Sequence, residues 1–333
     1  MKVSVLDYAV IDEGETASQA LAHTIQLAQK AEALGYQRFW MAEHHNVPAF
    51  ASSSPEVIMM QLLNHTQRIR IGSGGIMLPH YSPYKVVENF KVMEAYFPGR
   101  IDLGVGNNMG TPVVRKALER AGDKIPSYEE DLRQVYDYLT QSEDGQTKIL
   151  ANPQVEDLPA MWLLSTSVRR AKWAAEAGCA YVYGIFPYAR EDALEVGRQA
   201  IATYRKYFKA SQLLEEPKAM FSAFVATADQ EEEAEDLTRS LDLWLLGQDQ
   251  FSYYQRMPSV KTAKTTEITS QMAEKIKSNR SRMLHGKASQ VASQLKDWIE
   301  YLDADEALIM PLVPGIDKRM QTLELLARYL GTK

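Results

Sequence analysis

The sequence predicts a (β/α)8 barrel, a TIM barrel, with an insertion after its seventh strand. Short apolar runs typical of buried parallel strands alternate eight times with helical patterns along the 333 residues, and no long linker separates them. Polar residues directly follow several of these strands. The same alternation also permits a doubly wound parallel sheet. We expect residues 1–333 to form a single domain.

The first half of the chain contains four predicted strands. Apolar residues recur at helical spacing from Ser18 to Leu34, and Gly35 then ends the helix as a C-cap. Ser54 followed by Pro55 is typical of a second helix start. We expect strands at 3–8, 39–42, 70–79 and 99–106, and helices at 18–34, 55–63, 83–96 and 112–139, the last interrupted near Pro126.

The second half continues the alternation around one irregular region. We expect strands at 161–164, 180–184, 219–227 and 307–310. Helices are expected at 190–208, 288–302 and 318–330, and two more are expected, one that ends at 177 and one that starts at 229. The region 247–282 is polar and rich in Lys, Thr and Ser. We interpret it as the insertion and as a candidate mobile lid over the barrel mouth; the alternative is a solvent-exposed excursion.

Composition favours small-molecule chemistry. The chain is 45% hydrophobic and 24% charged with a net charge of -6, which argues against nucleic-acid binding. Cys179 is the only cysteine, so neither an intramolecular disulfide nor a cysteine-based metal site is expected. No uncharged run approaches the roughly 18 residues that span a membrane. We expect a cytoplasmic protein that does not act at a membrane.

In a barrel the functional face is built from residues that follow each strand. In this chain the residues that follow the strands carry carboxyl, imidazole, amide, hydroxyl or guanidinium groups, and two of them are glycines. They are Glu43, His44, His45, Asn46, Gly74, Gly75, Asn107, Asn108, Ser165, Thr166, Ser167, Arg169 and Arg170.

Glu43, His44 and His45 could supply acid/base chemistry, since imidazole titrates near neutral pH. Neighbouring residues of a strand face opposite ways, so the two histidines should not reach one metal ion. No further cluster has ligand spacing, and we predict no metal. We expect one histidine to face the barrel mouth and the other a helix or a subunit contact. The alternative is that one of them is merely packed in the structure.

Two other segments allow a functional and a structural interpretation. Ser165, Thr166 and Ser167 stand at a predicted helix start, which suits a phosphate but is also where a serine simply caps a helix. The run 104–110 is glycine-rich, but its spacing and its place at the fourth strand do not fit a dinucleotide-binding fingerprint. The glycines of 72–75 would let the backbone approach a flat ligand closely.

Four ordered motifs resemble the bacterial luciferase-like family of flavin-dependent monooxygenases across nearly the whole chain. They are Met41-Ala42-Glu43-His44-His45-Asn46, Ala51-Ser52-Ser53-Ser54-Pro55-Glu56-Val57, the segment 72–79 and the segment 99–106. The resemblance implies a barrel that binds reduced FMN as a co-substrate at its mouth and uses O2 to oxygenate a small organic molecule. It also implies a separate flavin reductase as a partner, and a homodimer.

The resemblance also implies roles for individual residues. His44 matches the family histidine that supports the flavin chemistry, and Glu43 lies beside it. Gly74 and Gly75, with Ser73, match the strand end under the flavin ring, where the family often has a non-proline cis peptide. Ser165, Thr166 and Ser167 match the phosphate-binding strand end. His45 and Glu88 match positions near the subunit interface.

Two positions depart from the family pattern. Where the family typically has an arginine that grips the FMN phosphate, this chain has Asn107; loss of such a charge-assisted hydrogen bond weakens binding by about ten- to a hundredfold. Arg170 replaces a small hydroxyl residue, and could restore the positive charge or simply fill the pocket. A non-catalytic paralogue, acting as a partner subunit or flavin-binding protein, is therefore the alternative function. A deazaflavin-dependent oxidoreductase on the same fold is the third.

Overall fold

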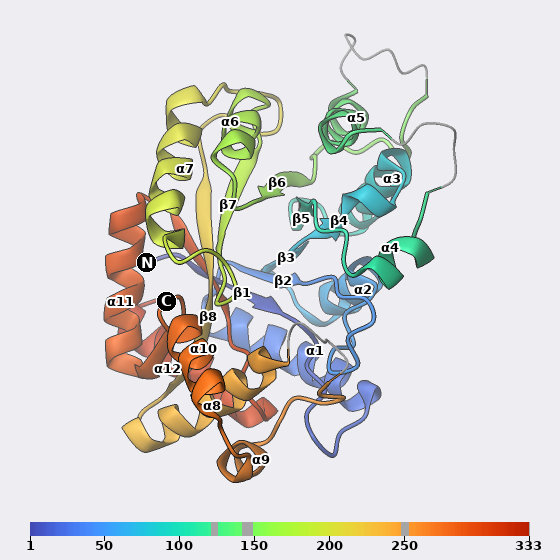
Figure 1. Cartoon of the computed structure of the whole chain (residues 1–333). Helices are drawn as coiled ribbons and strands as arrows, with labels where there is room; N and C mark the ends of the chain where they lie inside the picture. Colours follow the sequence, from blue (N-terminus) through green and yellow to red (C-terminus); the bar gives the residue numbers. More distant parts are fainter. Residues whose placement is uncertain (121–125, 142–148, 248–252, 333) are drawn as a thin grey trace.

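The computed structural model describes residues 1–120, 126–141, 149–247 and 253–332. Eight parallel strands form a closed barrel, because β10 pairs with β1 on one side and with β8 on the other (Figure 1). The strands are β1 (Val3–Asp7), β2 (Arg38–Met41), β3 (Arg70–Ser73), β5 (Ile101–Gly106), β6 (Ala160–Leu164), β7 (Ala180–Ile185), β8 (Ala219–Ala228) and β10 (Glu306–Met310). This closure confirms the barrel and excludes the doubly wound sheet.

Helices surround the barrel on its outer side (Figure 1). They are α1 (Ala17–Ala33), α2 (Pro55–His65), α3 (Pro83–Tyr96), α4 (Pro112–Ala117), α5 (Tyr128–Thr140), α6 (Val168–Glu176), α7 (Ala193–Tyr207), α8 (Glu231–Leu246), α9 (Val260–Thr265), α10 (Ser270–Arg280), α11 (Ala288–Leu302) and α12 (Ile316–Leu330). Among the described residues, no helix is both long and apolar enough to cross a membrane.

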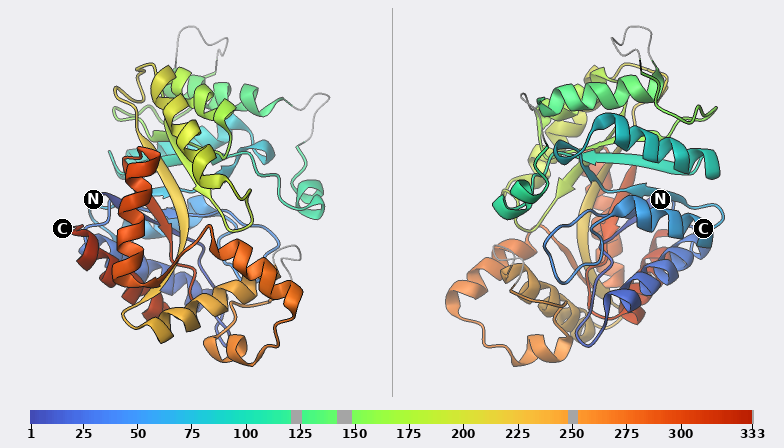
Figure 2. Two further views of the ribbon diagram at one scale, coloured as in Figure 1. Left: turned by 60° about the vertical axis from the view of Figure 1, so that its left-hand side comes forward. Right: turned by 90° about the vertical axis from the view of Figure 1, so that its right-hand side faces the viewer.

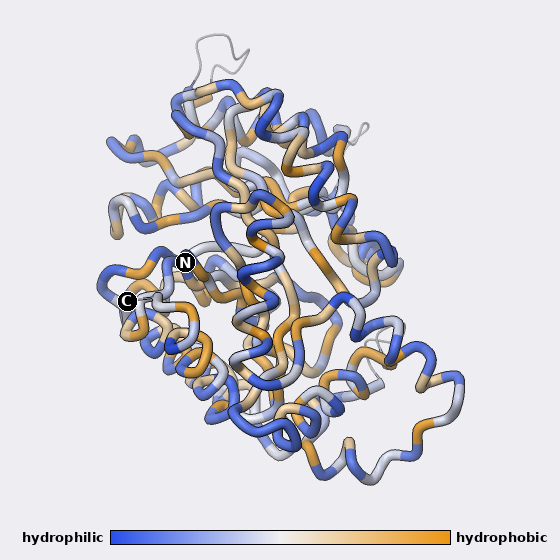
Figure 3. Tube along the Cα trace, turned by 90° about the vertical axis from the view of Figure 1, so that its left-hand side faces the viewer, coloured by the Kyte–Doolittle hydropathy of each residue, from blue (hydrophilic) through white to orange (hydrophobic). Residues whose placement is uncertain are grey.

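Alternation along the strands divides the core into two parts. Val5 and Phe39 belong to the layer between the strands and the helices, whereas Leu6 and Trp40 belong to the cluster inside the barrel. Successive residues of a strand point to opposite faces, which produces this division. In Figure 3, hydrophobic stretches run through the interior of the trace, and hydrophilic stretches are frequent on the peripheral helices. The strands thus bury both of their faces.

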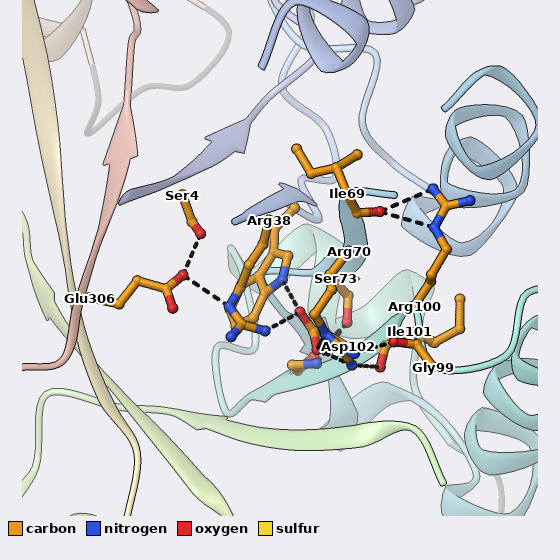
Figure 4. A network of polar contacts seen from close by, with 12 residues as sticks. Ser4, Arg38, Ile69, Arg70, Ser73, Gly99, Arg100, Ile101, Asp102 and Glu306 are labelled. Atoms are coloured by element: carbon orange, nitrogen blue, oxygen red, sulfur yellow. Dashed lines mark hydrogen bonds and ion pairs between the residues drawn. The ribbon is translucent and has the colours of Figure 1, made fainter. Parts of the chain in front are cut away.

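A buried network of charges fills the N-terminal end of the barrel (Figure 4). Asp102 accepts hydrogen bonds from Arg38 Nη1 at 2.8 Å, from Trp40 Nε1 at 2.9 Å and from Arg70 Nε at 2.8 Å. Burial alone would raise the pKa of Asp102, but the two guanidinium groups outweigh it and hold this pKa below its ordinary value. Arg38 also donates to Glu306, at 2.9 Å. This end of the barrel is therefore plugged, which leaves the opposite end for a site.

The third predicted strand, 70–79, is divided in the structure. After β3 the bond between Gly74 and Gly75 is cis, then β4 (Ile76–Met77) pairs with β5, and a 3-10 turn η1 covers Leu78–His80. The glycine-rich break expected in this strand is thus the interruption between β3 and β4, after which the chain pairs with β5 again.

The polar region 247–282 was expected to break the alternation. Its described part contains α9 and α10, and both pack against α8. Figure 2 shows these helices, in orange, at one edge of the molecule. A short strand not expected from the sequence, β9 (Leu284–Lys287), then pairs with the C-terminal half of β8. The insertion therefore returns to the barrel beside its mouth.

Candidate functional site

A cavity of about 200 Å³ opens at the C-terminal ends of the strands. Its lining combines glycines and apolar side chains with a few polar groups. The lining residues are Leu6, Tyr8, Glu43, His44, Gly74, Gly75, Met77, Gly106, Asn107, Asn108, Leu164, Ser165, Thr166, Val182, Gly184, Phe186, Tyr188 and Ser222. Most of the residues singled out in the sequence meet here, although they come from separate strands.

Gly74 and Gly75 form part of the cavity wall, and the peptide between them is cis, as the family resemblance implies. A Cβ on Gly75 would lie 2.9 Å from the carbonyl oxygen of Gly104, so the backbone between β3 and β4 approaches β5 too closely there for a side chain. Ser73 does not line the cavity. Its hydroxyl donates to the Gly104 carbonyl at 2.8 Å and accepts from the Gly104 N–H at 3.1 Å. Ser73 therefore supports the wall from behind.

His44 presents its ring to the cavity. The ring lies 4.5 Å from that of Tyr8 and 5.1 Å from that of Phe50, measured between centroids. Its Nδ1 is shielded from solvent and has no hydrogen-bond partner among the described residues. Burial lowers the pKa of His44 from its ordinary value to about 4, and the charge of His45 adds to this effect. His44 is therefore neutral near neutral pH.

His45, unlike His44, is not among the residues that line the cavity, and both histidines lie beyond the end of β2. The Nε2 atom of His45 lies 2.7 Å from Glu43 Oε1, which also accepts from the Tyr81 hydroxyl at 2.6 Å. The second Glu43 oxygen accepts from the backbone N–H of Met77 at 2.8 Å. Glu43 thus ties the end of β2 to β4 and to Tyr81. Its carboxylate is occupied by these contacts and has none with His44.

Hydroxyl groups and a helix start form one corner of the cavity. Ser165 and Thr166 line it, and Ser167 stands at the N-cap position of α6. The Ser167 side chain makes no capping hydrogen bond; instead the Ser167 N–H donates to Ser165 Oγ at 3.1 Å. The first amides of α6 have no partner within the helix, and the helix dipole favours an anion beside them. This corner suits a phosphate.

The two positions that depart from the family pattern lie apart. Asn107 is exposed at the cavity rim. Arg170 is not among the lining residues: its guanidinium lies over the ring of Tyr128, 4.8 Å from the centroid, and its Nε is 4.0 Å from Glu129. Its Nε is buried and has no hydrogen-bond partner among the described residues. In this geometry Arg170 does not restore a positive charge inside the cavity.

The lining residues that were not singled out in the sequence include Tyr8, Phe186, Tyr188 and Ser222. The strand-end rule could have found Tyr8 and Phe186, because each directly follows a barrel strand. They were not predicted because the prediction selected polar side chains and glycines at strand ends, and these two residues are aromatic. The described residues contain no group of three or more His, Cys, Asp or Glu placed to hold a metal ion.

Comparison with known proteins identifies the family. A model described as luciferase-like monooxygenase matches residues 1–305. The chain belongs to this family. This family member is similar to an N-acetyl-S-alkylcysteine monooxygenase from Bacillus subtilis, with 40% identity over 205 residues, which are 60% of this chain and 61% of the relative.

Solved structures agree with the assignment to the luciferase-like family. The crystal structure of apo-MsnO8 has a TM-score of 0.87 and 30% identity, and covers 100% of this chain and 99% of its own. The oxygenating constituent of 3,6-diketocamphane monooxygenase from Pseudomonas putida, solved in complex with FMN, has a TM-score of 0.71 and 16% identity, with 100% and 99% coverage. At that identity the second likeness shows the fold alone.

Proposed function

We propose that this chain is a reduced-FMN-dependent monooxygenase that transfers oxygen from O2 to a small organic substrate. The observation that carries the proposal is the cavity itself, where a glycine wall, the neutral His44 and the Ser165–Thr166 corner meet at one barrel mouth. Membership of the family, the FMN complex of the Pseudomonas relative and the oxygenase named in Bacillus support it. Reduced FMN would come from a separate reductase.

The residues present fit FMN in three respects. The close approach of Gly75 to β5 leaves that wall without side chains, which suits a flat ring system. His44 lines the cavity, and its Nδ1 has no hydrogen-bond partner among the described residues. Ser165, Thr166 and the first amides of α6 would hold the phosphate. The reduced flavin, when bound, supplies the electrons that activate O2.

The chain's own residues would contribute orientation and exclusion of water. A neutral His44 accepts or donates a hydrogen bond without carrying charge, because its pKa of about 4 leaves it unprotonated near neutral pH. Glu43 keeps β4 and Tyr81 in place, and Met77 covers part of the cavity. Oxygen transfer needs such a site, since enclosure protects reactive species from water.

Flavin titration of matched variants tests the proposal. FMN and riboflavin, which differ by the phosphate, are titrated into wild type, Thr166→Val and Ser222→Ala, in oxidised and reduced form. We expect wild type to bind FMN in the micromolar range and Thr166→Val to lose about tenfold or more of FMN affinity but little riboflavin affinity. Ser222→Ala, a hydroxyl loss on β8, should leave the ratio of the two affinities unchanged. Absence of binding at millimolar FMN would refute the proposal.

A non-catalytic flavin-binding paralogue is the second candidate. The observation that favours it is the lack of any Lys or Arg among the described residues lining the cavity, with Asn107 at the rim. Such a protein would bind FMN without changing the rate at which O2 reoxidises it. Stopped-flow oxidation of reduced FMN, with and without the chain, separates the two candidates.

We also propose that the chain forms a homodimer through α2 and α3. Val57, Val92 and Tyr96 leave 68%, 41% and 69% of their surface exposed on these helices. A second copy packed along these helices would cover these apolar side chains. Sedimentation velocity of wild type and Tyr96→Glu tests this, because a buried charge should shift the population to monomer.

A further inference from the structure

One side of the cavity is built from aromatic rings. Tyr8, Phe186 and Tyr188 line it, and we call them the aromatic wall. All three contact Phe224, which is 1% exposed: the centroid distances are 6.4, 6.2 and 6.5 Å for Tyr8, Phe186 and Tyr188. The wall thus packs on one buried side chain of β8, and its residues follow β1 and β7, whereas the hydroxyl corner follows β6.

Two rings of the wall stack on each other, and one of them remains partly exposed. Phe186 folds back over Gly184, where a Cβ would lie 2.2 Å from the Phe186 ring, so only glycine permits this position. Phe186 and Tyr188 then stack in parallel, with centroids 5.4 Å apart and 1° between their planes. Tyr188 keeps 51% of its surface exposed. A planar molecule can continue such a stack, because offset parallel rings attract one another.

Arg282 holds the loop that carries these two rings. Its Nε and Nη2 donate to the carbonyl oxygen of Pro187 at 2.8 and 2.5 Å, and the residue is only 5% exposed. Pro187 lies between Phe186 and Tyr188 in the sequence. Arg282 stands at the end of the insertion, just before β9. We therefore regard it as a positioning residue for the wall.

The cavity offers no partner for a charged substrate. None of the described lining residues is Lys or Arg, and the one carboxylate, Glu43, already accepts three hydrogen bonds. The Tyr8 hydroxyl donates to Met310 Sδ at 3.4 Å. An anion placed against the aromatic wall, rather than at the hydroxyl corner, would lose its hydration without meeting a cation, and a cation would find Glu43 occupied.

We infer that the aromatic wall binds the substrate and that this substrate is an uncharged molecule with a planar aromatic ring. The inference rests on the proposed function, since it assigns the wall to the substrate and the hydroxyl corner to the cofactor. A neutral ring gains stacking on Tyr188, while the hydroxyls of Tyr188 and Ser222 can bind one neutral polar group.

The test uses a naphthol and the matching naphthoate, which near neutral pH differ mainly in charge. Each is titrated into the full chain, with saturating FMN and without it, and FMN is titrated separately. We expect the naphthol to bind at least about tenfold more tightly than the naphthoate. Tyr188→Leu should weaken naphthol binding about three- to tenfold and leave FMN affinity unchanged. Tyr329→Leu, which removes an exposed ring of α12, is the matched control and should change neither.

Arg282→Gln probes the wall without touching its rings. The lost hydrogen bonds should lower the melting temperature, but naphthol binding should weaken while FMN affinity stays near wild type; a merely structural role would lower both affinities together. Equal or tighter binding of the naphthoate overturns the inference, as does a Tyr188→Leu variant that loses FMN affinity as much as naphthol affinity. If FMN fails to bind, the proposed function fails, but the naphthol preference of the FMN-free chain still decides whether the wall selects neutral rings.

Discussion

Replacing His44 with glutamine should remove a defined part of the pH dependence of folding stability. In the folded chain burial lowers the pKa of His44 from 6.5 to about 4. The unfolded chain, where the ring is hydrated, therefore takes up a proton first as the pH falls. The stability contributed by a neutral His44 is fully present above about pH 6.5 and is lost as the pH falls toward about 4.

The size of this effect follows from the two pKa values. A difference of 6.5 against about 4 corresponds to about 3 kcal/mol over the whole window. Between about pH 8 and about pH 5, linkage gives a loss of about 2 kcal/mol, because the unfolded ring is almost fully protonated at the lower pH and the folded ring is not.

Urea unfolding at a series of pH values measures the loss. The free energy of unfolding of wild type should fall by about 2 kcal/mol more than that of His44→Gln between about pH 8 and about pH 5. Asn107→Gln changes a cavity residue without a titrating group and should keep the wild-type slope. Parallel curves for wild type and His44→Gln would refute the reasoning, as would an NMR titration midpoint for the His44 ring near 6.5.

Three further substitutions test the supports of the site. Gly75→Ala should destabilise the chain by about 1–3 kcal/mol because its Cβ would meet the neighbouring backbone; Gly106→Ala, whose Cβ has no atom nearer than 3.9 Å, should not, and equal melting temperatures would contradict this. Glu43→Gln should lower the free energy of unfolding in urea by about 2 kcal/mol, since a neutral amide cannot accept all three hydrogen bonds. A variant as stable as wild type would show that Glu43 does not anchor β4 and Tyr81. Asp102→Asn should cost about 3–5 kcal/mol by leaving Arg38 under-compensated in the core, and a smaller loss in the same assay would mean that the network contributes little.

The order of the barrel strands was predictable because each buried strand carries its own local signal. The runs at 39–42, 161–164 and 180–184 are short, apolar and bounded by polar residues, and the structure places a strand in each. Strand boundaries within the glycine-rich segment 70–79 were less clear. There β3 ends at Ser73 and pairing with β5 resumes at Ile76, and nothing local to the sequence specifies which residues interrupt the strand.

The insertion was recognised by its polarity, but its contents were not. The helices α9 and α10 are short and mostly polar, with Ala263 and Asn279 their only buried residues. Their packing surface is supplied by α8, which precedes them in the chain. Short helices of this kind gain their stability from tertiary contacts rather than from propensity, so the pattern of residues alone favours a loop. The role of the insertion as a mobile lid remains a prediction.

The candidate site was predicted in position but less well in its details. The strand-end rule places Glu43, His44 and Ser165 at one barrel mouth, since the carboxyl ends of parallel strands meet there. It cannot give the pKa of His44, which depends on Tyr8 and Phe50 packing around the ring. Nor can it place Arg170, because the Tyr128 ring that receives its guanidinium belongs to another helix.

The glycines of the third strand show how a motif can serve packing and binding together. A Cβ on Gly72 would lie 2.5 Å from Trp40 Nε1 and 2.7 Å from Asp102 Cβ, inside the buried charge network. A Cβ on Gly75 would instead meet the Gly104 carbonyl at the cavity wall. The first glycine is therefore required by the barrel interior whether or not a flavin binds. The motif alone is weak evidence for a cofactor, and the case for one depends on groups that packing leaves unused, above all the unpartnered Nδ1 of His44.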